Sequence, residues 1–134
     1  MNKTYHGSCH CGTVKYQADL DLSQGTGKCN CTYCLKIRNW SARAGNLQVL
    51  QGQDALADYG KEWPGGNLHH RFCSKCGVTL YTQGHIPEAG GDFLSVQVNT
   101  LDDASIDELM SGPVRHSDGR NDNWMNPPAD IRHL

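Results

Sequence analysis

Hydrophobic residues in this chain occur in short runs that glycine and polar residues separate. Short runs rich in β-branched and aromatic residues and bounded by turn residues are typical of β-strands. The chain has 15 glycines, which indicates frequent turns between the strands. The pattern therefore predicts a mainly β fold, with strands at residues 12–18, 47–50, 68–72, 78–82 and 93–98.

A helical pattern is found in residues 102–110, DDASIDELM. Asp102 or Asp103 is the expected N-cap, because an aspartate side chain accepts hydrogen bonds from the free N–H groups of the first turn. Acidic residues follow in that turn, and Gly112 and Pro113 come shortly after the segment, where helices end. We therefore expect one short helix here.

The segment after Pro113 is rich in Asn, Asp, Gly and Pro. This composition predicts an irregular tail, anchored by the apolar side chains of Val114, Trp124 and Ile131. The chain has no low-complexity linker and no repeat. We expect a single domain at 1–134, with a core at about 5–124 and the tail beyond it.

Charge and hydropathy argue against two classes of protein. The 12 Lys and Arg residues are outnumbered by 14 Asp and Glu residues, for a net charge of −2, so we expect no nucleic-acid partner. The longest apolar runs fall far short of the roughly 20 residues that cross a bilayer, so we expect no membrane segment. The N-terminal MNKTYHGSCHCG lacks the apolar core of a secretory signal, which favours a cytoplasmic, reducing location.

The seven cysteines change the picture more than the charge does. Seven is an odd number, so a disulfide framework cannot pair all of them. In a reducing compartment, clustered cysteines more often bind metal or do chemistry than form bridges. A small glycine-rich β domain also has little room for a continuous core and often depends on a bound metal. We therefore expect zinc.

Two cysteine pairs are expected to form one site with four thiolates: Cys9 and Cys11 in GSCHCG, and Cys73 and Cys76 in FCSKCG. Zinc–sulfur bonds of about 2.3 Å in a tetrahedron place the sulfurs only about 3.8 Å apart, so each pair needs a tight backbone turn. A glycine follows each pair and permits such a turn. The prediction is a structural zinc; iron in a rubredoxin-like site, disulfides and free thiols are the alternatives.

The remaining cysteines, Cys29, Cys31 and Cys34 in GKCNCTYC, give three thiolates. Catalytic zinc sites keep three protein ligands and leave the fourth position to water or substrate, whereas structural sites are closed by four. Spacing alone leaves two interpretations open, an open catalytic zinc and a second structural zinc closed by a histidine. The candidates for that closing histidine are His69, His70, His85 and His116. A redox dithiol of Cys31 and Cys34 is disfavoured, because no βαβ unit is predicted around them.

The motifs GSCHCG, CNCTYC and RFCSKCG, in this order and spacing, resemble the family of glutathione-dependent formaldehyde-activating enzymes and the related centromere protein V domain. The resemblance covers residues 5–124, with softer matches at NLQVLQG, LADYG and HSDGRNDNW. It implies an Mss4-like fold, which consists of small antiparallel β-sheets built around zinc. It also implies that Cys9, Cys11, Cys73 and Cys76 hold a structural zinc, and that Cys29, Cys31 and Cys34 hold a catalytic one.

The activity that the resemblance implies is the addition of glutathione to formaldehyde, a carbon–sulfur lyase reaction that gives S-hydroxymethylglutathione. The expected cofactor is zinc at two sites, the second filled fully or in part, and the expected partners are a small thiol such as glutathione and a small aldehyde. The competing hypothesis is a zinc-binding interaction module of Mss4-like fold without catalysis. A metal-storage or redox-sensing protein is a third.

Residues beyond the cysteines are candidates for handling the substrate. Arg38 and Arg43 follow the cysteine triad, and guanidinium groups bind carboxylates in a bidentate way, so they are expected to bind the thiol's carboxylates. Trp40 is a candidate apolar wall. The stretch LKIRNWSARAG departs here from the serine–glycine pattern common in the family. For proton transfer the candidates are His69, His70 and His85, which the sequence does not separate.

Overall fold

The computed structural model describes residues 2–134 and is mainly β, as predicted. Two short α-helices and several 3-10 turns connect the strands. No helix among residues 2–134 is both long and apolar enough to cross a membrane. The strands are β1 (Lys3–Ser8), β2 (Lys15–Leu20), β3 (Thr26–Cys29), β4 (Ser41–Arg43), β5 (Gly45–Gln51), β6 (Leu56–Trp63), β7 (Gly66–Cys73), β8 (Thr79–Ile86), β9 (Gly91–Gln97) and β10 (Val114–Ser117), and the helices are α1 (Thr32–Ile37) and α2 (Ile106–Leu109).

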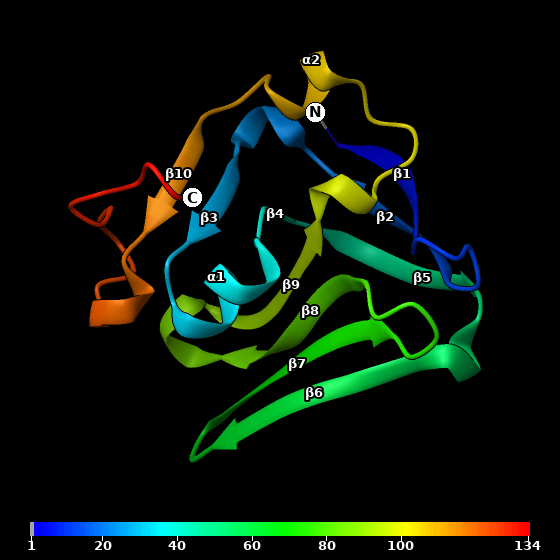
Figure 1. Ribbon diagram of the computed structural model, residues 1–134, viewed down its shortest axis with the longest axis horizontal. Coiled ribbons are helices and arrows are strands. Elements are labelled where there is room, and N and C mark those ends of the chain that lie inside the picture. Colours follow the sequence, from blue (N-terminus) through cyan, green and yellow to red (C-terminus); the bar gives the residue numbers. More distant parts are fainter. Residues whose placement is uncertain (1) are drawn as a thin grey trace.

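The strands form two sheets (Figure 1). The smaller has the order β1-β2-β5, and the larger has the order β10-β3-β4-β9-β8-β7-β6. All pairs are antiparallel except β10 with β3, which is parallel. The five predicted strands correspond to β2, β5, β7, β8 and β9, so these predictions are confirmed.

Both sheets contribute to a single hydrophobic core. Tyr16 and Leu20 of β2 alternate with more exposed residues, as a strand with one buried face requires. They belong to the same buried cluster as Leu80 of β8 and Val96 of β9. Burying each of the aliphatic side chains contributes roughly 1.5–3 kcal/mol. The core thus depends on the two sheets remaining together.

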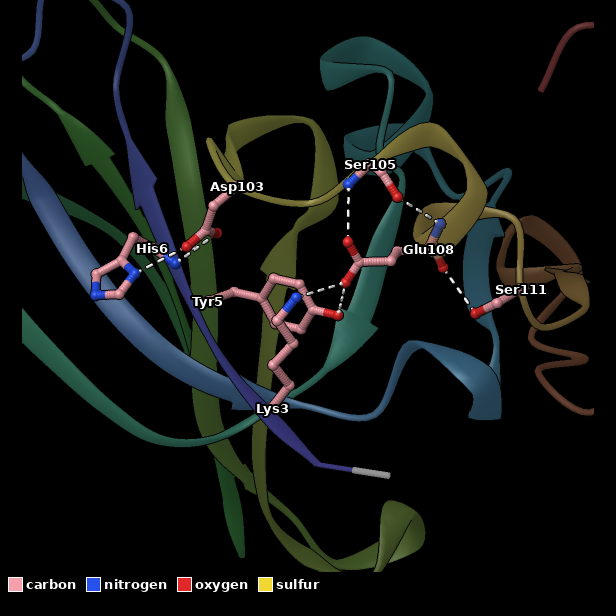
Figure 2. Close-up of polar contacts among 7 residues, drawn as sticks. All are labelled: Lys3, Tyr5, His6, Asp103, Ser105, Glu108 and Ser111. Atoms are coloured by element: carbon pink, nitrogen blue, oxygen red, sulfur yellow. Dashed lines mark hydrogen bonds and ion pairs between the residues drawn. The ribbon is translucent and has the colours of Figure 1, made fainter.

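The predicted helix at 102–110 is shorter than expected, and its N-cap is Ser105 rather than Asp102 or Asp103. The Ser105 hydroxyl accepts the Glu108 N–H at 3.1 Å, and the Glu108 carboxylate accepts the Ser105 N–H at 3.2 Å (Figure 2). This reciprocal pair is a capping box, which satisfies two N–H groups at once. The two aspartates upstream accept hydrogen bonds from β1 instead.

The Glu108 carboxylate also ties α2 to β1 (Figure 2). It accepts a hydrogen bond of 2.5 Å from the Tyr5 hydroxyl and one of 3.1 Å from the Lys3 ammonium group. These contacts hold the pKa of Glu108 down at about 2, with the Tyr5 hydrogen bond as the main cause. Burial and this carboxylate together raise the pKa of Tyr5 to about 12. At neutral pH the pair is therefore a phenol that donates to a carboxylate.

Two elements differ from the sequence-based expectation. The prediction of a single short helix is wrong, because α1 is a second one, with Cys31 as its N-cap. The segment after Pro113 begins with β10, whose residues pair in register with β3 up to Ser117 opposite Cys29. Val114 is half-buried in that strand, but Trp124 and Ile131 are 52% and 41% exposed and do not anchor the tail in the core.

Candidate functional site

The first cysteine cluster consists of Cys9, Cys11, Cys73 and Cys76, whose sulfur atoms all lie within 4.8 Å of one another. The Sγ atoms of Cys9 and Cys11 are 3.6 Å apart, and those of Cys11 and Cys73 are 3.8 Å apart. A tetrahedral zinc with four sulfur ligands needs a separation of about 3.8 Å. The four residues therefore fit a closed metal site.

Two matching backbone turns present these sulfurs. The Cys9 N–H donates to the Val14 carbonyl at 3.1 Å, and the Cys73 N–H donates to the Val78 carbonyl at 3.0 Å. The glycine after each pair has a positive φ, +77° and +80°, which favours glycine. The Val14 N–H also donates to the Cys9 sulfur at 3.3 Å. Each turn therefore directs a pair of sulfurs and backbone N–H groups to one point.

Backbone N–H groups near this cluster favour thiolate. Donation from the backbone of Cys11 and Val78 is the main reason that the pKa of Cys76 falls to about 6. Thiolates are the form in which cysteine binds metal. One pair lies between β1 and β2 of the smaller sheet and the other at the β7–β8 turn of the larger sheet, so the cluster joins the two sheets.

The second cluster consists of Cys29, Cys31 and Cys34, which we call the triad; its sulfur atoms also lie within 4.8 Å of one another. Cys29 ends β3, Cys31 caps α1 and Cys34 lies in the first turn of that helix. The Cys31 N–H donates to the Cys29 sulfur and the Cys34 N–H to the Cys31 sulfur, each at 3.3 Å. The strand end and the helix start thus hold three sulfurs around one point.

The sulfurs of the triad compete for protons. The contact with Cys29 lowers the pKa of the Cys31 thiol far below its usual value, while the contacts with Cys29 and Cys31 raise the pKa of Cys34. A thiolate of this kind, beside two further sulfurs, is a soft donor set suited to zinc. The residues present therefore fit a metal held by three sulfurs.

No fourth cysteine, histidine or carboxylate ligand joins the triad anywhere in residues 2–134. The imidazole of His69 is hydrogen-bonded to Asp58, and that of His85 to Asp92. His116 lies in β10 opposite Lys28. The geometry thus differs from that of the first cluster, where four sulfurs meet, and favours the open site over a site closed by histidine.

Of the candidate histidines, His70 is the one that packs beside the triad. Its ring stacks on that of Tyr33, which lies between Cys31 and Cys34 in the chain, with the ring centres 3.9 Å apart. Its Nδ1 is 2.9 Å from the Thr82 hydroxyl. Burial lowers the pKa of His70, and the negative charge of Cys31 partly opposes that shift. His70 is therefore neutral at neutral pH.

Three predicted substrate residues are occupied by other contacts. Arg38 ends α1 in the left-handed conformation and donates to a carbonyl of the C-terminal tail at 3.3 Å. The Trp40 indole donates to the Thr26 hydroxyl at 2.7 Å and packs against the core. Arg43 lies over the Phe93 ring at 4.2 Å. The Arg38 backbone N–H donates to the Cys34 carbonyl, but within residues 2–134 none of the three side chains contacts a triad sulfur, and their substrate roles stay predictions.

Sequence reasoning missed four residues in the surroundings of the triad, Asn30, Asp118, Gly119 and Trp124, of which Gly119 comes closest to a triad sulfur. Asn30 is 7% exposed and Asp118 is 8% exposed, and their side chains are hydrogen-bonded at 2.8 Å. The softly matching stretch HSDGRNDNW contains the last three, but its composition alone gave no sign of this contact.

Comparisons with known proteins show the family and the fold of the chain. The model of the family "Glutathione-dependent formaldehyde-activating enzyme" matches residues 4–116. A Halomonas elongata protein, provisionally named as such an enzyme, is 31% identical over 85 residues. The match covers 56% of this chain and 53% of the relative, so the chain spans about half the length of that relative. A Rhodobacter sphaeroides crystal structure, 24% identical, matches 84% of this chain and 99% of its own with a TM-score of 0.63, and so shares the fold. Because the family match covers most of its length, the chain belongs to the glutathione-dependent formaldehyde-activating enzyme family.

Proposed function

We propose that this protein is a zinc-dependent carbon–sulfur lyase of the S-(hydroxymethyl)glutathione synthase type, which adds glutathione or a similar thiol to a small aldehyde such as formaldehyde. The observation that carries the proposal is the inequality of the two cysteine clusters, four sulfurs in one and three in the other. Membership of the family supports the choice of thiol and aldehyde.

The two clusters have different roles in this proposal. Cys9, Cys11, Cys73 and Cys76 hold a structural zinc that joins the sheets, because four sulfurs complete its coordination. Cys29, Cys31 and Cys34 hold the catalytic zinc. When bound there, zinc supplies a fourth coordination position at which an incoming thiol is kept as a thiolate.

His70 is the residue that moves the proton. The reaction forms one carbon–sulfur bond, turns the carbonyl into an alcohol and transfers the thiol proton to the carbonyl oxygen. A neutral imidazole can accept that proton and then donate it to the oxygen as the carbon–sulfur bond forms. His70 is neutral because of its burial, and its ring packs beside the triad.

The activity can be measured by following the exchange between formaldehyde, glutathione and S-hydroxymethylglutathione by NMR, against the uncatalysed rate. The zinc-loaded protein should accelerate the exchange, and the Cys34→Ser variant, which lacks one triad sulfur, should not. Equal rates with and without the wild-type protein, at two bound zincs per chain, would contradict the proposal.

A further inference from the structure

The segment that follows β10 lies directly beside the triad, although the family match ends at residue 116. In Figure 1 this orange segment leaves β10 and turns next to the loop between β3 and α1. That loop contains Asn30, which lies between two triad cysteines in the chain.

Asn30 holds the segment through its backbone N–H and both polar atoms of its side chain. Its backbone N–H donates to the Ser117 carbonyl at 3.2 Å, and its side-chain amide donates to Asp118 at 2.8 Å. Its side-chain oxygen accepts the backbone N–H of Arg120 at 3.0 Å. Asp118 in turn accepts a hydrogen bond from Asn121 at 2.9 Å. Buried, hydrogen-bonded groups of this kind help to fix a segment in one position.

Gly119 makes the closest approach to the triad. A Cβ atom at this position would lie 2.7 Å from the Cys29 sulfur and 2.5 Å from the Trp124 ring. Both distances are shorter than real Cβ contacts, so a side chain would force the segment or the ring to move. The Trp124 indole donates to the Asp122 carboxylate at 2.6 Å, which orients the ring over this glycine. Gly119 and Trp124 thus form a wall beside Cys29.

Arg120 comes next in this wall and has a free charge. Its backbone N–H is bound to Asn30, so the residue lies beside the triad loop. Its side chain is exposed, and the guanidinium makes no hydrogen bond or ion pair with another residue of 2–134. The guanidiniums of Arg38 and Arg43, by contrast, donate to backbone carbonyls. An exposed guanidinium on a residue whose backbone is bound to the triad loop is suited to binding a carboxylate.

We propose that residues 118–124 form the substrate-facing wall of the triad site, and that Arg120 binds a carboxylate of the incoming thiol. This inference rests on the proposed function and refines it, because it makes the preferred substrate a thiol that carries a carboxylate. Gly119 and Trp124 limit the space beside Cys29, so the thiol enters past them. Arg120 is a positioning residue, since it holds the thiol and takes no part in the bond changes.

The test compares Arg120→Gln with Arg132→Gln, an exposed arginine of the same tail that pairs with Asp130. With formaldehyde, Arg120→Gln should raise the KM for glutathione about 10-fold, the loss expected for a hydrogen bond between charged groups. Its KM for 2-mercaptoethanol, which lacks a carboxylate, and its kcat should not change. Gly119→Ala should raise the KM for both thiols, because its methyl group displaces the wall. Arg132→Gln should behave as wild type.

A second measurement needs no turnover. Alkylation of the zinc-loaded protein by iodoacetate and by iodoacetamide, followed at the triad by peptide mass spectrometry, reports on positive charge beside these sulfurs. In the Arg120→Gln variant, the alkylation rate with iodoacetate divided by the rate with iodoacetamide should fall severalfold. In the Arg132→Gln variant this ratio should not change. An unchanged ratio together with an unchanged KM for glutathione would overturn the inference. A lowered ratio in a protein without turnover would retain the inference and overturn the proposed reaction.

Discussion

Cys31 is both a triad sulfur and the N-cap of α1, where it accepts the Cys34 N–H at 3.3 Å. Metal binding and helix capping by this residue respond differently when the sulfur is replaced by oxygen. A serine hydroxyl is a good N-cap but a poor zinc ligand. One conservative substitution can therefore separate metal binding from the local fold.

Cys31→Ser should lower the zinc content from two ions to one per chain and abolish activity, while circular dichroism and solubility stay as in wild type. Zinc is measured by atomic emission on protein purified with zinc in excess. Retention of two zincs in this variant would show that Cys31 is not a ligand.

His69 is a matched control for His70, because the two are neighbours in one strand and successive residues of a strand face opposite sides of the sheet. His70→Gln should lower kcat roughly 10²-fold, the usual effect of losing a proton-transfer group, and leave two zincs in place. His69→Gln, whose imidazole meets Asp58 on the other face, should keep the wild-type kcat. Equal effects of the two substitutions on kcat would refute a specific role for His70.

At the scale of elements, the contact between α2 and β1 depends on one carboxylate, that of Glu108. Glu108 completes the capping box and accepts hydrogen bonds from Tyr5 and Lys3 (Figure 2). A carboxyl group whose pKa is lower in the folded chain stabilises the fold above its unfolded pKa. That stabilisation is lost as the pH falls towards the folded value.

For Glu108 this loss falls between its ordinary pKa of 4.5 and about 2. Glu108→Gln should therefore be less stable than wild type at pH 7, and the difference should shrink as the pH falls below 4.5. Urea unfolding of both proteins, from pH 7 down to the lowest pH at which both keep their zinc, measures this difference, because loss of the structural zinc would itself unfold the chain. A difference that stays constant from pH 7 to below 4.5 would contradict the role given to this carboxylate.

Short-range patterns allowed only some elements to be predicted. The strands at 12–18 and 93–98 carry an alternation that is visible locally and appear as β2 and β9. The helix α1 was missed because it has six residues and a cysteine cap, which is not a usual cap residue. The strand β10 was missed because it forms by parallel pairing with β3, which is far away in the chain.

For the site, the clustering of the seven cysteines was visible in the sequence, because metal ligands recur at short spacings. The contact of Gly119 with Cys29 was not, because it joins residues 90 positions apart through the tertiary structure. The face on which each histidine lies likewise required the sheet register.

For the whole molecule, the four-cysteine cluster links the two sheets in addition to their shared core, since Cys9 and Cys11 lie between β1 and β2 of the smaller sheet and Cys73 and Cys76 at the β7–β8 turn of the larger. The triad lies within the larger sheet and α1. Loss of metal from the two clusters should therefore have unequal consequences for the fold. Binding energy at a structural zinc site is folding energy.

A chelator should remove the two ions in separate steps. The triad ion should leave first, with loss of activity and little change in circular dichroism, and the second should leave slowly, together with unfolding. Cys76→Ser, which opens the four-cysteine cluster, should give insoluble or unfolded protein, in contrast to Cys31→Ser. Release of both ions in one step without unfolding would contradict the structural role of the first cluster.

The central claim is that the triad ion has three protein sulfurs and accepts a thiol as its fourth ligand. Anomalous scattering at the zinc edge, from crystals soaked in glutathione, tests it most directly. We predict two zinc peaks per chain. At the peak between Cys29, Cys31 and Cys34, a sulfur atom of glutathione should be the fourth ligand. A single peak, or a protein side chain in the fourth position with glutathione absent, would contradict the account.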